Sequence, residues 1–126
     1  MNIGLGQGRT TTIGVAQANI NYQKILIIVK KMKVSNERFF KVCGIDFYLL
    51  TMDGPTEDDD QWNAFFSQST LIDGFDIYLN ILQEDKQLRR CLFHEIIEAL
   101  WISKGKQGNE AHQIALIQEI EYFGER

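Results

Sequence analysis

The order of the hydrophobic patterns along the chain is the feature that most restricts its fold. Segments with the composition and alternation of β-strands fill the middle of the sequence, and two segments with helical spacing follow them towards the C-terminus. Strands that precede any long helix are typical of α+β domains, in which helices pack on one face of a small sheet. We therefore predict an α+β fold: a small antiparallel β-sheet, then a helix, then a second helix antiparallel to the first.

Three stretches are predicted to supply the strands. Ile25 to Val34 is predicted as one strand, because its apolar run from Ile25 to Val29 has the length and the β-branched content of a buried strand. The stretch from Phe39 to Leu50 divides at Cys43-Gly44, where the glycine indicates a hairpin turn or a bulge. From Phe75 to Asn80 apolar and polar residues alternate, which is the pattern of a half-buried strand.

Two helices are predicted to close the chain. The first runs from about Asp85 to Ser103; acidic residues at its start complement the positive end of the helix dipole, and Gly105 ends it. The second starts near Asn109, a residue type that caps helix N-termini, and runs to about Phe123. Because the connection between them is short, the two helices should be antiparallel neighbours.

The chain length and its first segment suggest how the domain is bounded. A length of 126 residues is sufficient for one domain with a modest core. Residues 1 to about 23 are rich in Gly, Thr, Asn and Gln and have weak periodicity, which is typical of a disordered or loosely docked segment. Met32-Lys33-Val34 resembles a natural start of translation. We therefore predict a poorly ordered or loosely docked extension over residues 1–31 and one metal-binding domain over residues 32–126.

The composition favours a soluble protein without a membrane segment. Hydrophobic residues make up 44% of the chain and charged residues 24%, which is ordinary for a globular protein. No apolar run approaches the roughly eighteen residues that a membrane span needs. Cys43 and Cys91 form neither a disulfide framework nor a CxxC pair, which favours a reducing cytoplasm.

The net charge of -4 conceals an asymmetry between the start of the chain and the rest. Up to Lys41 the only acidic residue is Glu37, whereas the remainder is strongly acidic, most densely from Glu57 to Asp60. A basic segment can favour nucleic acid. These lysines have no aromatic interleaving and no recognisable motif, so we do not expect that partner. The acidic run follows Gly54-Pro55 and is predicted to be a solvated loop.

Polar side chains interrupt the apolar run from Leu92 to Trp101 at three positions, and such groups are expensive to bury unless each has a partner. His94 and Glu98 are four residues apart, so they lie on one helix face with Cα atoms about 6 Å apart. That spacing lets an imidazole nitrogen and a carboxylate oxygen bind one metal ion at about 2 Å each. Glu95 lies about 100° round the helix, beside the metal, where a base acting on water would be needed.

His112 is the candidate third ligand, because it is the only other histidine and lies in the first turn of the following helix. The chain climbs from Glu98 to the turn and returns, so the two positions differ in height by only about 3 Å at roughly 1.5 Å per residue. His94, Glu98 and His112 would then form a His₂Glu set with one position open for water, as in catalytic zinc sites. Structural zinc sites usually close with four protein ligands, often cysteines.

Simpler interpretations exist for the same residues. His94 and Glu98 could be a hydrogen-bonded pair on one helix face, and Glu95 a solvated surface carboxylate. Cys91, one turn before His94, could be a soft ligand, although a buried thiol is the favoured interpretation.

Other side chains of the two helices have structural interpretations. Glu110 and Glu119 are spare carboxylates, expected to be solvated on the outer face of the last helix. Trp101 and Phe123 are predicted core residues.

Three segments together resemble a known family. They are Lys41 to Tyr48, Gly74 to Asn80, and the run Leu92-Phe93-His94-Glu95-Ile96-Ile97-Glu98-Ala99. In this order they resemble the small zincin-like metallopeptidase-type proteins common in phages and prophages, which carry HEIIEA or HEIIHA at their core.

The resemblance covers about Met32 to Phe123 and is specific from His94 to Ala99. It implies His94, Glu98 and His112 as ligands, Glu95 as the base, and a short antiparallel sheet before the active-site helix. The sequence departs from the commoner zincin motif because Glu98 stands where a second histidine is usual.

These observations predict a zinc-dependent, metallopeptidase-like hydrolase in which the metal and Glu95 activate water. A peptide or protein is a possible substrate, which the edge of the strand that ends at Asn80 could hold by strand addition. The alternative is a non-catalytic, phage-derived accessory or interaction protein with a structural or vestigial metal site. Iron or manganese could fill the same ligand set, although oxygenases with such triads usually have larger β-barrels.

Overall fold

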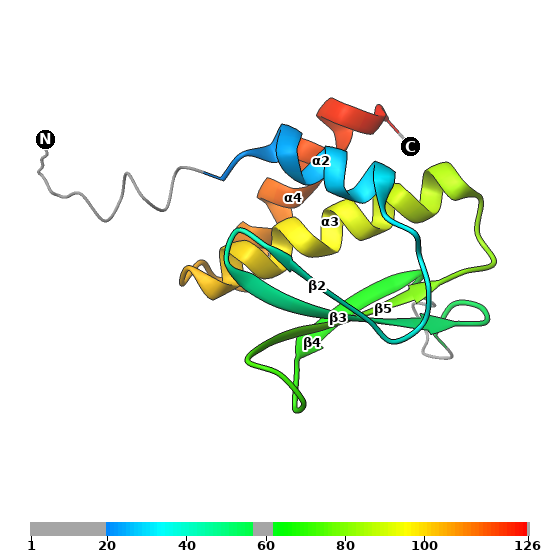
Figure 1. Ribbon diagram of the computed structural model, residues 1–126. Coiled ribbons are helices and arrows are strands. Elements are labelled where there is room, and N and C mark those ends of the chain that lie inside the picture. Colours follow the sequence, from blue (N-terminus) through cyan, green and yellow to red (C-terminus); the bar gives the residue numbers. More distant parts are fainter. Residues whose placement is uncertain (1–19, 57–61, 126) are drawn as a thin grey trace, which may run out of the picture.

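The computed structural model describes residues 20–56 and 62–125 (Figure 1). Among these residues a four-stranded sheet packs against three helices, and two of the helices follow the sheet in the sequence, so the predicted α+β class is confirmed. In chain order the elements are α2 (Tyr22–Lys31), β2 (Arg38–Val42), β3 (Ile45–Met52), β4 (Ala64–Gln68), β5 (Gly74–Asn80), α3 (Asp85–Ser103) and α4 (Gly108–Phe123).

The sheet is mixed and not wholly antiparallel, which corrects the predicted topology. Its strand order is β2-β3-β5-β4; β2 and β3 are antiparallel, β3 and β5 are parallel, and β4 and β5 are antiparallel. The parallel pair arises because the chain leaves β3, forms β4 at the edge of the sheet, and then turns back so that β5 lies between β3 and β4. β4 was not predicted from the sequence, and its position at the edge brings it beside the helices of the site.

The stretch from Phe39 to Leu50 divides as predicted. Cys43 and Gly44 join β2 to β3 with φ values of 51° and 81°, and two successive positive φ values are what a tight two-residue hairpin turn requires. The strand predicted from Phe75 to Asn80 is β5, in which Ile77 and Leu79 are fully buried. At the start of β5, a Cβ on Gly74 would lie 1.9 Å from the carbonyl oxygen of Asp46.

The prediction of a strand from Ile25 to Val34 is wrong, because residues Tyr22–Lys31 form helix α2. The side chain of Asn21 caps this helix by accepting a hydrogen bond from the Lys24 backbone N–H at 3.1 Å. Ile25 and Val29 are one turn apart and both fully buried, so the apolar residues follow helical spacing. A short, β-branched apolar run does not distinguish a buried strand from a buried helix, and here helical packing prevailed.

Helix α2 belongs to the same core as the residues after it. It contacts α3, and the indole Nε1 of Trp101 donates a hydrogen bond to the hydroxyl of Tyr22 at 3.0 Å. The predicted boundary after residue 31 therefore separates two helices that pack together. The rest of the predicted extension, residues 1–19, and the acidic run of residues 57–60 lie outside the described residues.

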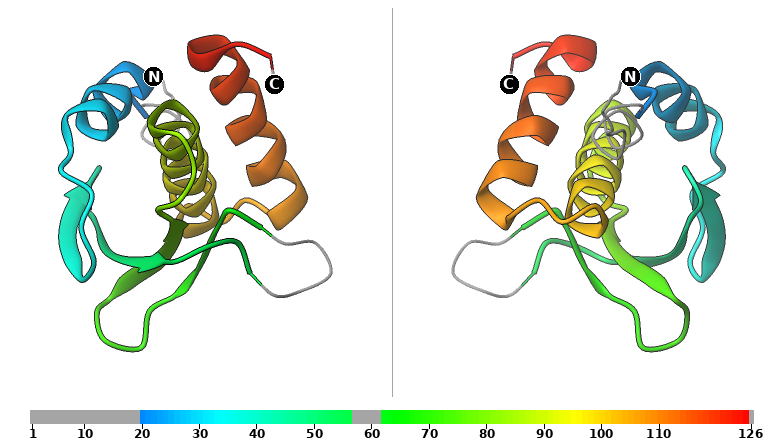
Figure 2. Two further views of the ribbon diagram at one scale, coloured as in Figure 1. Left: turned by 90° about the vertical axis from the view of Figure 1, so that its right-hand side faces the viewer. Right: turned by 90° about the vertical axis from the view of Figure 1, so that its left-hand side faces the viewer.

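The helices form one layer over the sheet, with α3 in the middle and α2 and α4 on either side of it (Figure 2). Helix α3 has the predicted bounds and is buried on most of its circumference, as expected of a helix enclosed by other elements. Trp101 and Phe123 are buried, as predicted. Within the described ranges, no helix is both long enough and apolar enough to span a bilayer.

Candidate metal centre

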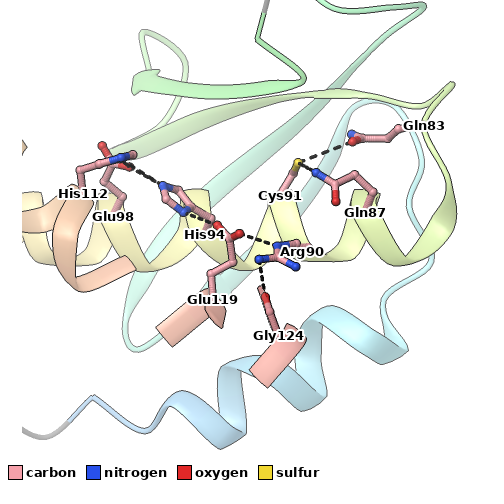
Figure 3. A network of polar contacts seen from close by, with 9 residues as sticks. All are labelled: Gln83, Gln87, Arg90, Cys91, His94, Glu98, His112, Glu119 and Gly124. Atoms are coloured by element: carbon pink, nitrogen blue, oxygen red, sulfur yellow. Dashed lines mark hydrogen bonds and ion pairs between the residues drawn. The ribbon is translucent and has the colours of Figure 1, made fainter. Parts of the chain in front are cut away.

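The structure brings His94 and Glu98 of α3 together with His112 of α4 (Figure 3). Helix α3 ends at Ser103, and Gly105 adopts a φ of 95° in the short connection that reverses the chain. Helix α4 then starts at Gly108, so His112 lies in its first turns, next to Glu98. The predicted N-cap residue, Asn109, is already inside this helix, and the N-cap is Gln107.

The distances between the three groups match one face of a tetrahedral metal site. His94 Nε2 lies 2.9 Å from Glu98 Oε1 and 3.3 Å from His112 Nδ1, and His112 Nδ1 lies 3.2 Å from Glu98 Oε1. With bonds of about 2.0 Å and tetrahedral angles, ligand atoms lie roughly 3.3 Å apart. The three side chains thus form a group that could bind a metal ion.

The group is buried on one side and open on the other. The side chain of His94 is 8% exposed, that of Glu98 17% and that of His112 51%. A metal ion held by these three groups would face solvent beside His112, which is where a water molecule or a substrate could approach. Catalytic zinc sites have such an accessible position.

The imidazole of His94 lies between two carboxylates. Burial disfavours its charged form, but hydrogen bonds to Glu119 and Glu98 outweigh burial and raise the pKa of His94 to about 9. Burial also opposes ionisation of Glu98, yet the hydrogen bonds from His94 and His112 lower its pKa overall. Without a bound cation the group therefore contains an imidazolium, whose Nε2 proton a metal ion would replace.

Glu119 is fully buried beside this group, which corrects the prediction that it is solvated on an outer face. Its Oε1 is 2.8 Å from His94 Nδ1, and its Oε2 accepts a hydrogen bond from Arg90 Nε. A spacing signal could have revealed it, because the buried residues of α4 recur every four positions: Ala111, Ala115, Glu119 and Phe123. Glu119 therefore lies on the face that packs against α3.

Arg90 is a further buried residue, and no sequence pattern predicted its burial. It lies one turn before His94 on α3, and only 4% of it is exposed. Besides its ion pair with Glu119, its Nη2 donates a hydrogen bond to the carbonyl oxygen of Gly124 at 2.6 Å. A buried charge needs such partners, and the pair and the carbonyl supply them.

Glu95, the predicted base, is largely enclosed but contributes to the pocket wall. Burial raises the pKa of Glu95 to about 7; the charge of His94 opposes this rise, and those of Glu98 and Glu119 add to it. A carboxyl group that titrates near neutral pH suits proton transfer. Its role as the base stays a prediction.

Two adjoining pockets, of about 400 and 420 Å³, open over this group. Both are lined by Ala64, the first residue of β4, by Trp62 two residues before it, and by His94, Glu95 and His112 from the helices. The volumes suit a small ligand or a short peptide segment. The pocket wall opposite the helices is therefore the start of β4.

The strand that ends at Asn80 cannot offer a free edge, which corrects the predicted position for strand addition. It is β5, and it pairs with β3 on one side and β4 on the other. The edge strand next to the pocket is β4, because it pairs only with β5 among the described strands.

Cys91 and Glu110 have structural surroundings. Cys91 is buried, with Sγ 3.5 Å from Gln83 Oε1 and 3.6 Å from Gln87 Nε2, as a structural thiol would be (Figure 3). Glu110 is exposed, as predicted. Cys43 is a free, exposed cysteine.

Comparisons of this chain with protein-family models, with curated proteins and with solved structures found no match.

Proposed function

We propose that this protein is a zinc-dependent hydrolase that acts on peptide bonds. The observation that carries the proposal is a metal-matching donor group, His94, Glu98 and His112, which is open on one side and shares its pocket with Glu95. The resemblance of the segment from His94 to Ala99 to zincin-like proteins of phages supports the same activity.

The donor group suits zinc better than magnesium or calcium. Two imidazole nitrogens and one carboxylate oxygen are ligands that zinc prefers, whereas the harder cations favour oxygen alone. A bound zinc ion would lower the pKa of a water molecule and polarise a carbonyl group.

Glu95 would act as the proton carrier of the reaction. In its ionised form it accepts a proton from water, and in its protonated form it donates that proton to the leaving amine. Its pKa of about 7 lets both forms exist near neutral pH. Hydrolysis then needs no further acid from the protein.

An extended peptide would bind along the edge strand β4. The chain from Trp62 to Phe66 lines the pockets, and a peptide paired with that edge would pass in front of His112 and Glu95. Half-exposed Trp62 would contact an apolar side chain of the substrate.

Metal analysis of purified variants tests the metal site. We expect one zinc ion per chain in the wild type, and none after His94→Ala or His112→Ala. Glu110→Ala is a matched control, because Glu110 lies on the same helix turn as His112 and is exposed. Iron or manganese in place of zinc would correct the metal, and loss of zinc from no variant would contradict the site.

An assay on a library of short peptides tests the activity. Glu95→Gln should keep the zinc and lose hydrolysis, because the amide cannot accept the proton. Hydrolysis that is unchanged by this substitution would exclude Glu95 as the base. Stoichiometric zinc without hydrolysis of any peptide would favour a non-catalytic binding protein.

A further inference from the structure

We propose that Glu119, held by Arg90, is a positioning residue that fixes the orientation of the His94 ring and makes Nε2 the atom presented to the metal. This inference rests on the proposed metal site and adds to it residues outside the donor group. It assigns a role to the buried Arg90–Glu119 pair, which the hydrolytic reaction itself does not use.

The two oxygens of Glu119 have different partners. Oε1 lies 2.8 Å from Nδ1 of His94, and Oε2 accepts from Nε of Arg90. The carboxylate is 0% exposed, so neighbouring protein groups such as these, and not bulk solvent, orient it. The His94 ring is thereby held on its buried side at a hydrogen-bonding distance.

Glu119 does not belong to the donor group itself. It contacts Nδ1, whereas Nε2, on the other side of the imidazole ring, faces Glu98 and His112 (Figure 3). An ionised carboxylate can only accept a hydrogen bond, so Nδ1 must carry a hydrogen. The lone pair that remains for a metal is then on Nε2. Metal-binding histidines commonly donate their second N–H to a carboxylate in this way.

Arg90 supplies the charge and the geometry that Glu119 needs. It is buried one helical turn before His94, and its Nη2 is tied to the Gly124 carbonyl oxygen at the end of α4. The guanidinium therefore connects three points: α3, the carboxylate of Glu119 and the end of α4. Through these contacts the packing of the two helices determines the position of His94.

Nitrogen-15 NMR of the wild-type protein with zinc provides the direct test. We expect His94 to carry its hydrogen on Nδ1 and to bind zinc through Nε2. Zinc on Nδ1, or a hydrogen on Nε2 of the zinc-loaded protein, would overturn the proposal. This measurement requires no variant, so it remains available if a substitution prevents folding.

Charge-balanced double variants separate positioning from stability. Arg90→Met with Glu119→Met removes both charges and the acceptor, and Arg90→Met with Glu119→Gln removes the charges but leaves an acceptor. Neither leaves an isolated buried charge, which is the main danger of a single substitution. We expect the zinc dissociation constant, from chelator competition, to rise about 10- to 100-fold in the first variant and less in the second.

Glu121→Gln is the control, because Glu121 is exposed on the same helix, and it should leave zinc affinity unchanged. A folded Arg90→Met, Glu119→Met variant that binds zinc as tightly as the wild type would overturn the inference while leaving the proposed zinc site intact. A wild-type protein that binds no zinc would overturn both.

Discussion

The two sides of the His94 ring differ in the burial and the charge pairing of their neighbours. On the Nδ1 side, Glu119 and Arg90 are both buried and neutralise each other's charge. On the Nε2 side, Glu98 and His112 are partly open to solvent, and the protein supplies no further cation among the described contacts of that side.

This difference indicates that the two sides of the ring have different roles: one fixes its position, and the other could bind an ion. A buried ion pair with every partner in place holds a geometry, because it has nothing to gain from another ligand. The half-open group of two imidazoles and a carboxylate brings three possible ligand atoms together, and a metal ion could replace the proton that His94 holds there. The same histidine thus contacts a buried ion pair on one side and, on the other, a group that could bind a metal ion.

The largest expected effect comes from breaking the buried side. Arg90→Met leaves the Glu119 carboxylate without its countercharge, and loss of one partner of a buried pair costs about 3–5 kcal/mol of the free energy of unfolding. Urea denaturation measures it. The charge-balanced Arg90→Met, Glu119→Met variant should recover most of this loss. A single variant that is no less stable than the double variant would contradict the distinction between the two sides.

The stability of the metal-free protein should depend on pH, because the positive charge of His94 stabilises the open side. The pKa of His94 is raised to about 9 from 6.5, so its contribution to stability is fully present below pH 6.5 and is lost as the pH rises through 9. The pKa of Glu95, raised to about 7 from 4.5, acts in the same direction at lower pH.

Thermal unfolding with a chelator present should therefore show stability falling from about pH 5 to pH 9. With zinc in excess the fall should shrink, because the metal replaces the proton on His94 and binds more tightly as protons leave. Stability that is constant or rising between pH 6.5 and 9 without metal would contradict the charge state described for His94.

The smallest effect on stability is expected on the open side. Glu98→Gln keeps one acceptor oxygen for His94, so it should change the free energy of unfolding of the metal-free protein by about 1 kcal/mol or less. Zinc at a hundred times its dissociation constant would stabilise the wild type by about 2.7 kcal/mol, and the variant should lose most of this gain. Equal zinc stabilisation of both proteins would remove Glu98 from the donor group.

The sequence predicted the helices of the site better than the sheet. The bounds of α3 follow from helical spacing with clear end signals, and the short connection placed His112 near Glu98. Helix α2 was mistaken for a strand because its β-branched composition was given more weight than the helical spacing of its apolar residues, such as Ile25 and Val29. Strand β4 lacks such a pattern, because three partly buried residues are followed by two exposed ones and no alternation marks it.

Glu119 and Arg90 were missed for a related reason. Charged residues are expected on helix surfaces, so their types alone indicate exposure. Each is a main partner that makes burial of the other possible, and the two lie 29 residues apart on different helices. Pairing between helices is decided by rotation of each about its axis. For α4, the four-residue spacing of buried residues from Ala111 to Phe123 indicates which face is turned towards the core.

Gly74 shows that a residue outside the candidate site can be intolerant of substitution. A side chain there would collide with the Asp46 carbonyl oxygen, so β5 would have to separate from β3 at its first residue. Strand β4 is joined to the sheet through β5 alone, and the pocket wall at Trp62 and Ala64 would move with it. A scan of substitutions would then find this glycine among the sensitive positions, although it contributes no atom to the group of His94, Glu98 and His112.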